Sequence, residues 1–427
     1  MFKRAAFLLC AGVVLAAAAT TTSGQDGEDD PKVVEAKAAP GYAHRLARGK
    51  GVPHQTRINA ALNWLKDHQH KDGHWSSQTF SADSKREKAA KTYNLEFRAA
   101  GSDKGDRGWE ESVDVGLTGL ALMAFTGAGH DHARESDYRQ CVRMGLMALR
   151  KVQSNDGCIG PKDDDHFVYN HAIATIAVAE IYGLTSDAVL KPMVEKAIEF
   201  TLKAQNPGMG WRYGVKPGNN DSSITGWMVM ALNAARLAGL EVDTEQAFDG
   251  AAKWFKAATT ETKGKYKTGY DTAGSNNARL RNTTDYSHNP AMSAIYIKSM
   301  LIMGKADLKD AAVKSLAAAC VEKEMLPVWS HYKIDYYYWH FASMALYEVG
   351  GANWASWEKA MSKVLLDNQR GWHATDVKNK HTTAEALDEH GSWDAVDPWG
   401  QAGGRVYATA INCLTLQTYS RYQRTSK

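Results

Sequence analysis

The sequence carries little excess charge of either sign. Its 51 lysines and arginines face 48 aspartates and glutamates, which gives a formal net charge of +3 at pH 7. Proteins that bind nucleic acids or anionic membranes through electrostatic attraction usually carry a marked positive excess. The composition therefore gives no reason to expect a nucleic acid or a membrane surface as partner.

Cysteine is scarce, and the familiar cofactor motifs are missing. Cys10 lies in an N-terminal apolar stretch, and we expect the other four cysteines to be small buried residues within helical patterns or their turns. These are Cys141, Cys158, Cys320 and Cys413. No phosphate-binding loop, nucleophile elbow or dinucleotide fingerprint occurs. No metal-ligand spacing is found among His171, His288, His331 and His373. The sequence therefore predicts no metal ion and no other cofactor.

Long hydrophobic runs are absent after residues 5–19. Lys3 and Arg4 precede this run and small residues follow it, which is typical of a secretory signal peptide. The run is too short to cross a bilayer comfortably, and no later segment suits a membrane span. We expect residues 1–24 to be a signal peptide cleaved near residue 24, and the mature protein to be exported, either periplasmic or secreted. Residues 25–54 are polar and unpatterned, so we expect a flexible leader there.

What the chain does contain is a recurring unit rich in aromatic residues. In residues 64–75, WLKDHQHKDGHW, a helix ends, a glutamine follows Leu65 by four residues, the chain turns at Gly73, and Trp75 closes the unit. Related copies occupy residues 149–157, 200–211 and 365–372. A unit that recurs roughly every 50 residues predicts a stacked or closed array.

Between these units, two kinds of helix alternate. The first kind is amphipathic, as in the stripe of Ile58, Ala61, Leu62 and Leu65. Similar segments cover about residues 138–152, 193–205, 245–257, 309–322 and 354–368. The second kind is apolar nearly all round and covers residues 113–127, 169–183, 222–239, 289–304, 335–350 and 404–419.

A helix without a polar face must be covered on all sides. The alternation therefore predicts an all-α fold, an (α/α)6 toroid in a single domain over residues 55–425, with six inner and six outer helices. An open helical solenoid is the alternative, but it would leave the buried helices wet on one face. The long links 76–112, 258–288 and 370–403 all emerge at the N-terminal ends of the inner helices, where we expect a ligand-binding mouth.

The repeated units resemble the QW-type repeats of the superfamily of prenyltransferase β-subunits and squalene–hopene cyclases. This resemblance implies a toroid whose cavity holds isoprenoids. The functional motifs of that superfamily are largely missing. Asp163, Asp164 and Asp165 lack the acid pattern of the cyclases, while Tyr337 and Tyr407 stand where prenyltransferases have zinc-binding cysteine and histidine. Zinc-dependent prenyl transfer is therefore not expected.

Acidic residues recur at one position of the predicted repeat. Glu111, Asp221 and Asp335 each lie near the start of an inner helix, and Asp114 lies one turn inside its helix. A carboxylate there accepts free backbone N–H groups and complements the helix dipole, so capping is the simplest interpretation. The same placement directs several acids into the mouth, and paired carboxylates are what glycosidases use. These four acids are the candidate catalytic residues.

Aromatic residues form the second candidate set, since their faces stack on sugar rings and contact apolar chains. The candidate ligand-binding residues in and after the outer-to-inner links are Trp109, Tyr270, Tyr336, Trp339, Trp393, Trp399 and Tyr407. Arg405, beside them, is expected to pair with Asp394 or Asp397 or to hold an anionic ligand.

Three functions remain open from the sequence. The first is a binding protein whose aromatic cavity takes an apolar, isoprenoid-like or extended ligand such as a peptide. The second is a cyclase-like lyase or isomerase acting on isoprenoids, with Asp335 or Asp114 as the acid. The third is a carbohydrate-active glycosidase or lyase that acts on an oligosaccharide with paired carboxylates. The fold alone cannot choose among them.

Overall fold

The structure is a computed structural model that describes residues 36–46, 52–92, 106–108, 111–164, 166–276, 289–330, 333–373, 376, 383 and 386–423. These residues belong to one compact unit, Ala36–Lys427. The predicted signal peptide, residues 1–24, lies outside the described residues, and its cleavage and the export of the protein stay predictions.

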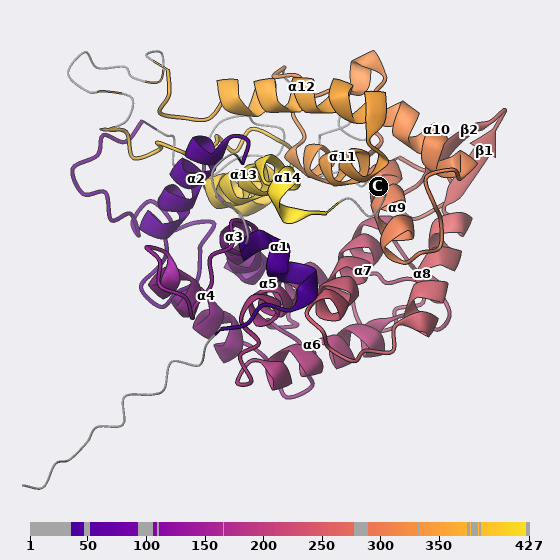
Figure 1. Ribbon diagram of the computed structural model, residues 1–427, viewed down its shortest axis with the longest axis horizontal. Coiled ribbons are helices and arrows are strands. Elements are labelled where there is room, and N and C mark those ends of the chain that lie inside the picture. Colours follow the sequence, from indigo (N-terminus) through magenta and orange to yellow (C-terminus); the bar gives the residue numbers. More distant parts are fainter. Residues whose placement is uncertain are drawn as a thin grey trace, which may run out of the picture. The chain divides into compact units, whose positions relative to one another are not determined.

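The predicted alternation of two kinds of helix is confirmed. The buried inner helices are α3 (Asp114–Gly127), α5 (Phe167–Thr185), α7 (Ser222–Leu237), α9 (Ala291–Ile302), α11 (Tyr336–Val349) and α13 (Gly400–Leu416). The amphipathic outer helices are α2 (Gln55–Asp67), α4 (Arg139–Lys151), α6 (Lys191–Ala204), α8 (Glu245–Ala257), α10 (Ala311–Cys320) and α12 (Gly351–Asp367). Figure 1 shows the second set surrounding the first.

The inner helices form a closed ring. Each contacts the next along the chain, and α13 contacts α3 as well as α11. Small residues allow the close approach, because a Cβ atom on Gly119 of α3 would lie 2.9 Å from the backbone nitrogen of Ala174 in α5. Closure leaves no wet face on the ring, which excludes the open solenoid.

The repeated glutamine ties neighbouring outer helices together. In each copy its side-chain amide donates one hydrogen bond to a carbonyl of its own turn and one to a carbonyl of the next outer helix. The pairs are Gln69 with Gly73 and Cys141, Gln153 with Gly157 and Met193, Gln205 with Met209 and Ala247, and Gln369 with Gly391 and Arg57. The last pair joins α12 back to α2, so the outer ring closes as the inner ring does.

A buried tryptophan fastens three of these turns to the helix before it. The indole N–H of Trp75 donates to the carbonyl of Leu65 at 2.7 Å, and that of Trp211 donates to Thr201 at 2.8 Å. In the last copy Trp393 makes this bond, to Leu365 at 2.9 Å. The sequence copy ending at Trp372 is therefore interrupted by an insertion, and Trp393 completes it.

The outer-to-inner link after α8 contains a hairpin that the sequence patterns did not predict. Strands β1 (Thr259–Thr262) and β2 (Lys265–Thr268) pair antiparallel, with Thr259 opposite Thr268. Lys263 and Gly264 both have positive φ angles, 53° and 76°, as a two-residue hairpin turn requires. The strands are short and polar, so no apolar alternation marked them.

Part of the predicted flexible leader is an ordered helix, which corrects the expectation for residues 25–54. Helix α1 (Pro40–Leu46) contacts α5 and α7. Tyr42 is 1% exposed, packs with Leu184 and Ala238, and donates its hydroxyl to the carbonyl of Ala234 at 3.1 Å. One aromatic residue thus anchors a segment whose overall composition is polar.

Among the described residues one helix, α5, is long and apolar enough to cross a membrane. Of its apolar window, 89% is buried within the protein. Its hydropathy is explained by its position in the inner ring.

Candidate functional site

Asp221 and Asp335 are the N-cap residues immediately before α7 and α11, as predicted. The Oδ1 atom of Asp221 accepts the backbone N–H of Ile224 at 2.7 Å, and that of Asp335 accepts the N–H of Tyr338 at 2.9 Å. Asn289 also donates to Oδ2 of Asp335 at 2.6 Å. The Oδ2 atom of Asp221 is buried and has no partner among the described residues.

Burial controls the protonation of both capping carboxyls. It raises the pKa of Asp221 to about 7 and that of Asp335 to about 6, against the opposing hydrogen bonds from their helices. Both side chains are closed off, since the two residues are 0% and 3% exposed. Neither is placed to transfer a proton to a ligand that arrives from solvent.

Asp114 is the most accessible of the described candidate acids. It begins α3, is 9% exposed, and accepts the backbone N–H of Ser77 at 2.8 Å. Burial raises the pKa of Asp114 to about 6. Glu111 begins the short 3-10 helix η1 (Glu111–Val113), but its side chain lies outside the described residues, as does all of Trp109.

The structure places Asp397 against the first residue of α11, next in sequence to Asp335. Oδ2 of Asp397 accepts the backbone N–H of Tyr336 at 3.2 Å and the hydroxyl of Tyr407 at 3.3 Å. Its Oδ1 atom accepts the N–H of Gly400 at 2.7 Å. Both carboxylates hold helix ends together, so this proximity does not supply the free pair that a glycosidase needs.

Side-chain hydroxyls from three inner helices form a hydrogen-bonded cluster at the N-terminal ends of those helices. The hydroxyl of Tyr169 in α5 donates to Ser223 in α7 at 2.8 Å, and Ser223 lies 2.6 Å from the hydroxyl of Tyr337 in α11. Trp227 donates its indole N–H to the same tyrosine at 3.2 Å. The ring of Trp399 lies 5.7 Å from that of Tyr337.

A second pair extends this cluster toward the link before α7. The hydroxyls of Tyr213 and Tyr270 lie 2.6 Å apart, and the rings of Tyr213 and Tyr169 are 6.2 Å apart. Tyr169, Tyr213, Tyr337 and Trp399 are half-buried, so each residue keeps some exposure to solvent. We call Tyr169, Tyr213, Ser223, Tyr270, Tyr337 and Trp399 the hydroxyl cluster.

Of this cluster, the predicted ligand-binding residues include Tyr270 and Trp399. Tyr169, Ser223 and Tyr337 stand inside patterns that predict buried helix. A usable signal was present, because each is a hydroxyl-bearing residue in the first turn of an otherwise apolar inner helix.

Three of the predicted ligand-binding aromatics are structural. Trp393 and Tyr336 are 0% exposed and Trp339 is 1% exposed. Trp393 fastens the last turn, and the hydroxyl of Tyr336 donates to the carbonyl of Asp394 at 2.9 Å. Their burial corrects the expectation that they contact a ligand. Tyr407, 8% exposed and bonded to Asp397, is nearly closed off as well.

Arg405 is a structural cation, 1% exposed, and not a binding site for an anionic ligand. Its guanidinium donates to Asp106 at 2.8 Å, to Ser392 at 2.7 Å and to Asp394. The predicted pairing with Asp394 is confirmed, whereas Asp397 is engaged elsewhere. Burial outweighs the arginine and raises the pKa of Asp106.

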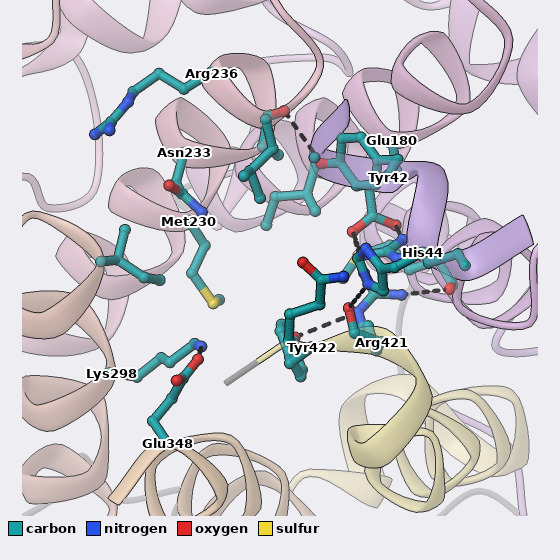
Figure 2. A pocket seen from close by; sticks show the side chains of 18 of the residues that line it. Tyr42, His44, Glu180, Met230, Asn233, Arg236, Lys298, Glu348, Arg421 and Tyr422 are labelled. Atoms are coloured by element: carbon teal, nitrogen blue, oxygen red, sulfur yellow. Dashed lines mark hydrogen bonds and ion pairs between the residues drawn. The ribbon is translucent and has the colours of Figure 1, made fainter. Parts of the chain in front are cut away.

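A cavity of about 340 Å³ lies at the other end of the ring, beside the C-terminal halves of the inner helices (Figure 2). Met123, Ile176, Met230 and Leu301 contribute apolar lining. Helix α1 and the residues after α13 also contribute to its wall, including Arg45 and Tyr422. The sequence predicts a mouth only at the opposite end, where the long links lie, and a flexible leader in the segment that contains α1.

Charged groups in this cavity are mostly paired. Glu180 accepts from Arg45 at 3.1 Å and also from Arg421, and Lys298 donates to Glu348 at 2.8 Å (Figure 2). Burial acts to raise the pKa of Glu180, but the two guanidinium groups outweigh it and hold the pKa below its ordinary value.

His340, also in the cavity lining, leaves one ring nitrogen open. The hydroxyl of Thr415 donates its hydrogen to Ile411 at 2.8 Å, so the 3.3 Å contact with His340 needs a proton on Nδ1. Burial lowers the pKa of His340 to about 3, which keeps the ring neutral. Nε2 is therefore an acceptor, and it has no partner among the described residues.

Comparison with known proteins was made by family, by sequence and by structure. No family model matches the chain, and no curated protein matches its sequence. Solved structures do match across most of its length. An unsaturated glucuronyl hydrolase from a Bacillus species aligns with a TM-score of 0.53 at 11% identity, over 85% of this chain and 95% of the other.

Two further solved structures match this chain about as well. An α-amylase from Clostridium perfringens has a TM-score of 0.52 at 13% identity, over 85% of this chain and 97% of its own. An α-1,6-mannanase from a Salegentibacter species, in complex with α-1,6-mannotriose, has a TM-score of 0.51 at 11% identity, over 86% and 98%. This chain is an α/α toroid. At such low identity the likeness supports the toroid alone and does not single out the prenyltransferase and squalene–hopene cyclase superfamily.

Proposed function

We propose that this toroid binds an oligosaccharide at the N-terminal end of its inner ring. The observation that carries the proposal is the hydroxyl cluster. Sugar rings are recognised by aromatic faces together with hydrogen-bonding groups, and the cluster offers both in one place. These hydroxyls bond to one another, but each oxygen has two acceptor lone pairs, and an isoprenoid offers no donor groups to use the remaining ones, whereas a sugar does.

The arrangement supports binding more than hydrolysis. Asp221 and Asp335 are engaged as helix caps and are closed to solvent. If a glycosidic bond is cleaved, Asp114 is the suitable general acid among the described residues, because its pKa of about 6 keeps part of it protonated near neutral pH.

Titration with short oligosaccharides tests the proposal. Trp227 and Trp399 lie against Tyr337, so an occupied site should change the tryptophan fluorescence. Probes of the kind named for the similar structures, α-1,6-mannotriose and maltotriose, together with a glucuronate disaccharide, cover neutral and acidic sugars. We expect saturable binding of at least one probe.

The decisive variant is Tyr337→Phe, which keeps the ring and removes the hydroxyl. It should weaken binding about tenfold, the effect of losing roughly one hydrogen bond. Tyr347→Phe is the matched control, since Tyr347 is a half-buried tyrosine at the opposite end of the same helix. Absence of saturable binding for all probes, or equal losses in the two variants, would overturn the proposal.

The cavity supports a second candidate function, the binding of a small molecule with an apolar body. Its volume of about 340 Å³ lies within the usual range for ligand sites, and His340 offers an open acceptor. Dodecanol suits this chemistry, having an apolar chain and one hydroxyl donor. We expect it to raise the melting temperature, and Met230→Trp, which fills the cavity, to abolish that rise. An unchanged melting temperature with wild-type protein would exclude this function.

A further inference from the structure

The turn after α2 brings two histidines and an aspartate together on one side. Nδ1 of His70 lies 2.9 Å from Oδ1 of Asp72, and Nδ1 of His74 lies 2.5 Å from the same oxygen. The two imidazole rings are 4.6 Å apart between centroids. Potential ligand atoms from all three residues lie within 4.8 Å of one another.

The backbone of this turn fixes the grouping. Gly73 has a φ angle of 102°, and a Cβ atom there would lie 2.1 Å from the carbonyl oxygen of Met144. The backbone N–H of His70 donates to the carbonyl of His74 at 3.0 Å, which closes the turn. The side-chain amide of Gln69 donates to the carbonyl of Gly73 at 2.7 Å and stabilises the turn. The three side chains are therefore held on a rigid frame at the surface.

A second carboxylate faces the far nitrogen of each histidine. Nε2 of His70 lies 3.9 Å from Asp83, and Nε2 of His74 lies 3.9 Å from Asp114. Histidines that bind a metal through one nitrogen usually present the other N–H to a carboxylate, which fixes the ring and its tautomer. Each ring here has a carboxylate on that side, at a separation longer than a direct hydrogen bond, and the two near nitrogens are directed at the same Asp72 oxygen.

The second copy of the turn shows what the fold itself requires. Ser154, Asp156 and Cys158 occupy the corresponding positions, and Ser154 donates to Asp156 at 2.6 Å. The aspartate is thus part of the turn in both copies. The imidazoles are not, because serine and cysteine replace them without loss of the turn.

We propose that His70, Asp72 and His74 bind a divalent transition-metal ion, with zinc the best fit. Two imidazole nitrogens and a carboxylate oxygen are good zinc ligands at about 2.0–2.2 Å each. The three side chains are 26%, 51% and 30% exposed, so they can separate slightly to admit the ion. A fourth position is open to water or to a ligand, which is the arrangement of a catalytic zinc site.

This site was not predicted from the sequence, where the other histidines showed no metal-ligand spacing. The proposed site also adjoins Asp114, a candidate general acid, whose carboxylate lies beside His74. The proposal does not depend on oligosaccharide binding, since a metal-binding measurement with no sugar present tests it.

Calorimetric titration of the chelator-treated chain with zinc chloride at about pH 7.5 provides the test. We expect one equivalent to bind with micromolar or tighter affinity, and cobalt(II) in its place to show the intense visible absorption of a four-coordinate site. The double variant His70→Ala/His74→Ala should weaken binding at least a hundredfold. Asp83→Asn, which removes a supporting carboxylate, should weaken it on the order of tenfold.

The matched control is Ser154→Ala/Cys158→Ser in the second copy of the turn, which should bind zinc as the wild type does. Circular dichroism and the melting temperature of the metal-free variants report whether each variant folds. A wild-type chain without stoichiometric binding would overturn the proposal. So would a folded histidine double variant that binds zinc with wild-type affinity.

Discussion

At the scale of single residues, the carboxyls at the inner-helix ends link stability to pH. Asp221 is buried, and its pKa is raised from 3.8 to about 7. The folded protein therefore holds a proton that the unfolded chain has already released. Stabilisation from this proton is complete below about pH 4 and is lost as the pH rises through about 7.

Asp221→Asn should flatten this dependence. Asparagine keeps an oxygen to accept the Ile224 N–H, so the cap survives, but it cannot ionise. Between about pH 5 and about pH 8, the wild-type free energy of unfolding should fall by on the order of 2 kcal/mol more than that of the variant. Urea unfolding at these two pH values measures the difference. Parallel pH profiles would show that Asp221 ionises normally in the folded state.

Single residues were the least predictable level of the structure. Asp221 and Asp335 could be predicted as caps because capping depends on a local position in the repeat. The hydroxyl cluster could not, because Tyr169, Ser223 and Tyr337 come from helices that are far apart in the chain and meet only in the closed ring. Glu180 shows the same limit, since its partners Arg45 and Arg421 lie near the two ends of the sequence.

At the scale of elements, the last repeated turn depends on Trp393 and not on Trp372. Trp393→Phe removes the indole N–H bond to Leu365 and should lower the free energy of unfolding by about 1–3 kcal/mol. Trp372→Phe is the control in the same link. The indole N–H of Trp372 has no partner among the described residues, so the loss should stay below about 1 kcal/mol. Denaturant midpoints compare the two variants, and a larger loss for Trp372→Phe would contradict this assignment.

Helices were predictable because each one shows its surroundings in its own pattern. Inner helices have no polar face and outer helices have one. The elements that were not predicted contain too few apolar residues to show a pattern. They are the polar strands β1 and β2 and helix α1, in which Tyr42 makes the main packing contact. The position of Trp393 was also hidden, because 22 residues separate Gln369 from Gly391 where Gln69 and Gly73 are separated by four.

At the scale of the whole molecule, closure should make the contact between the last and first repeats as important as an internal one. Gln369 joins α12 to α2, and Gln69 joins α2 to α4. Gln369→Ala and Gln69→Ala each remove two hydrogen bonds from a buried amide and should each cost about 2 kcal/mol.

Equilibrium unfolding followed by circular dichroism and by tryptophan fluorescence measures both costs. We expect each variant to unfold in one transition that the two probes report at the same denaturant concentration. An early separate transition in Gln369→Ala alone would mean that the array opens at this seam before it unfolds. The toroid was predictable at this scale because twelve alternating helices, six of them without a polar face, bury those six completely only when the ring is closed.

The interrupted last turn has a consequence for protein engineering. The bonds that define the turn, from Gln369 to Gly391 and from Trp393 to Leu365, remain in place although a long segment is spliced between their ends. The fold thus tolerates an insertion at this point of the repeated unit. The equivalent position between Gln205 and Met209 is a suitable insertion site for a peptide or a reporter loop. The other copies of the unit offer further insertion sites around the same end of the ring.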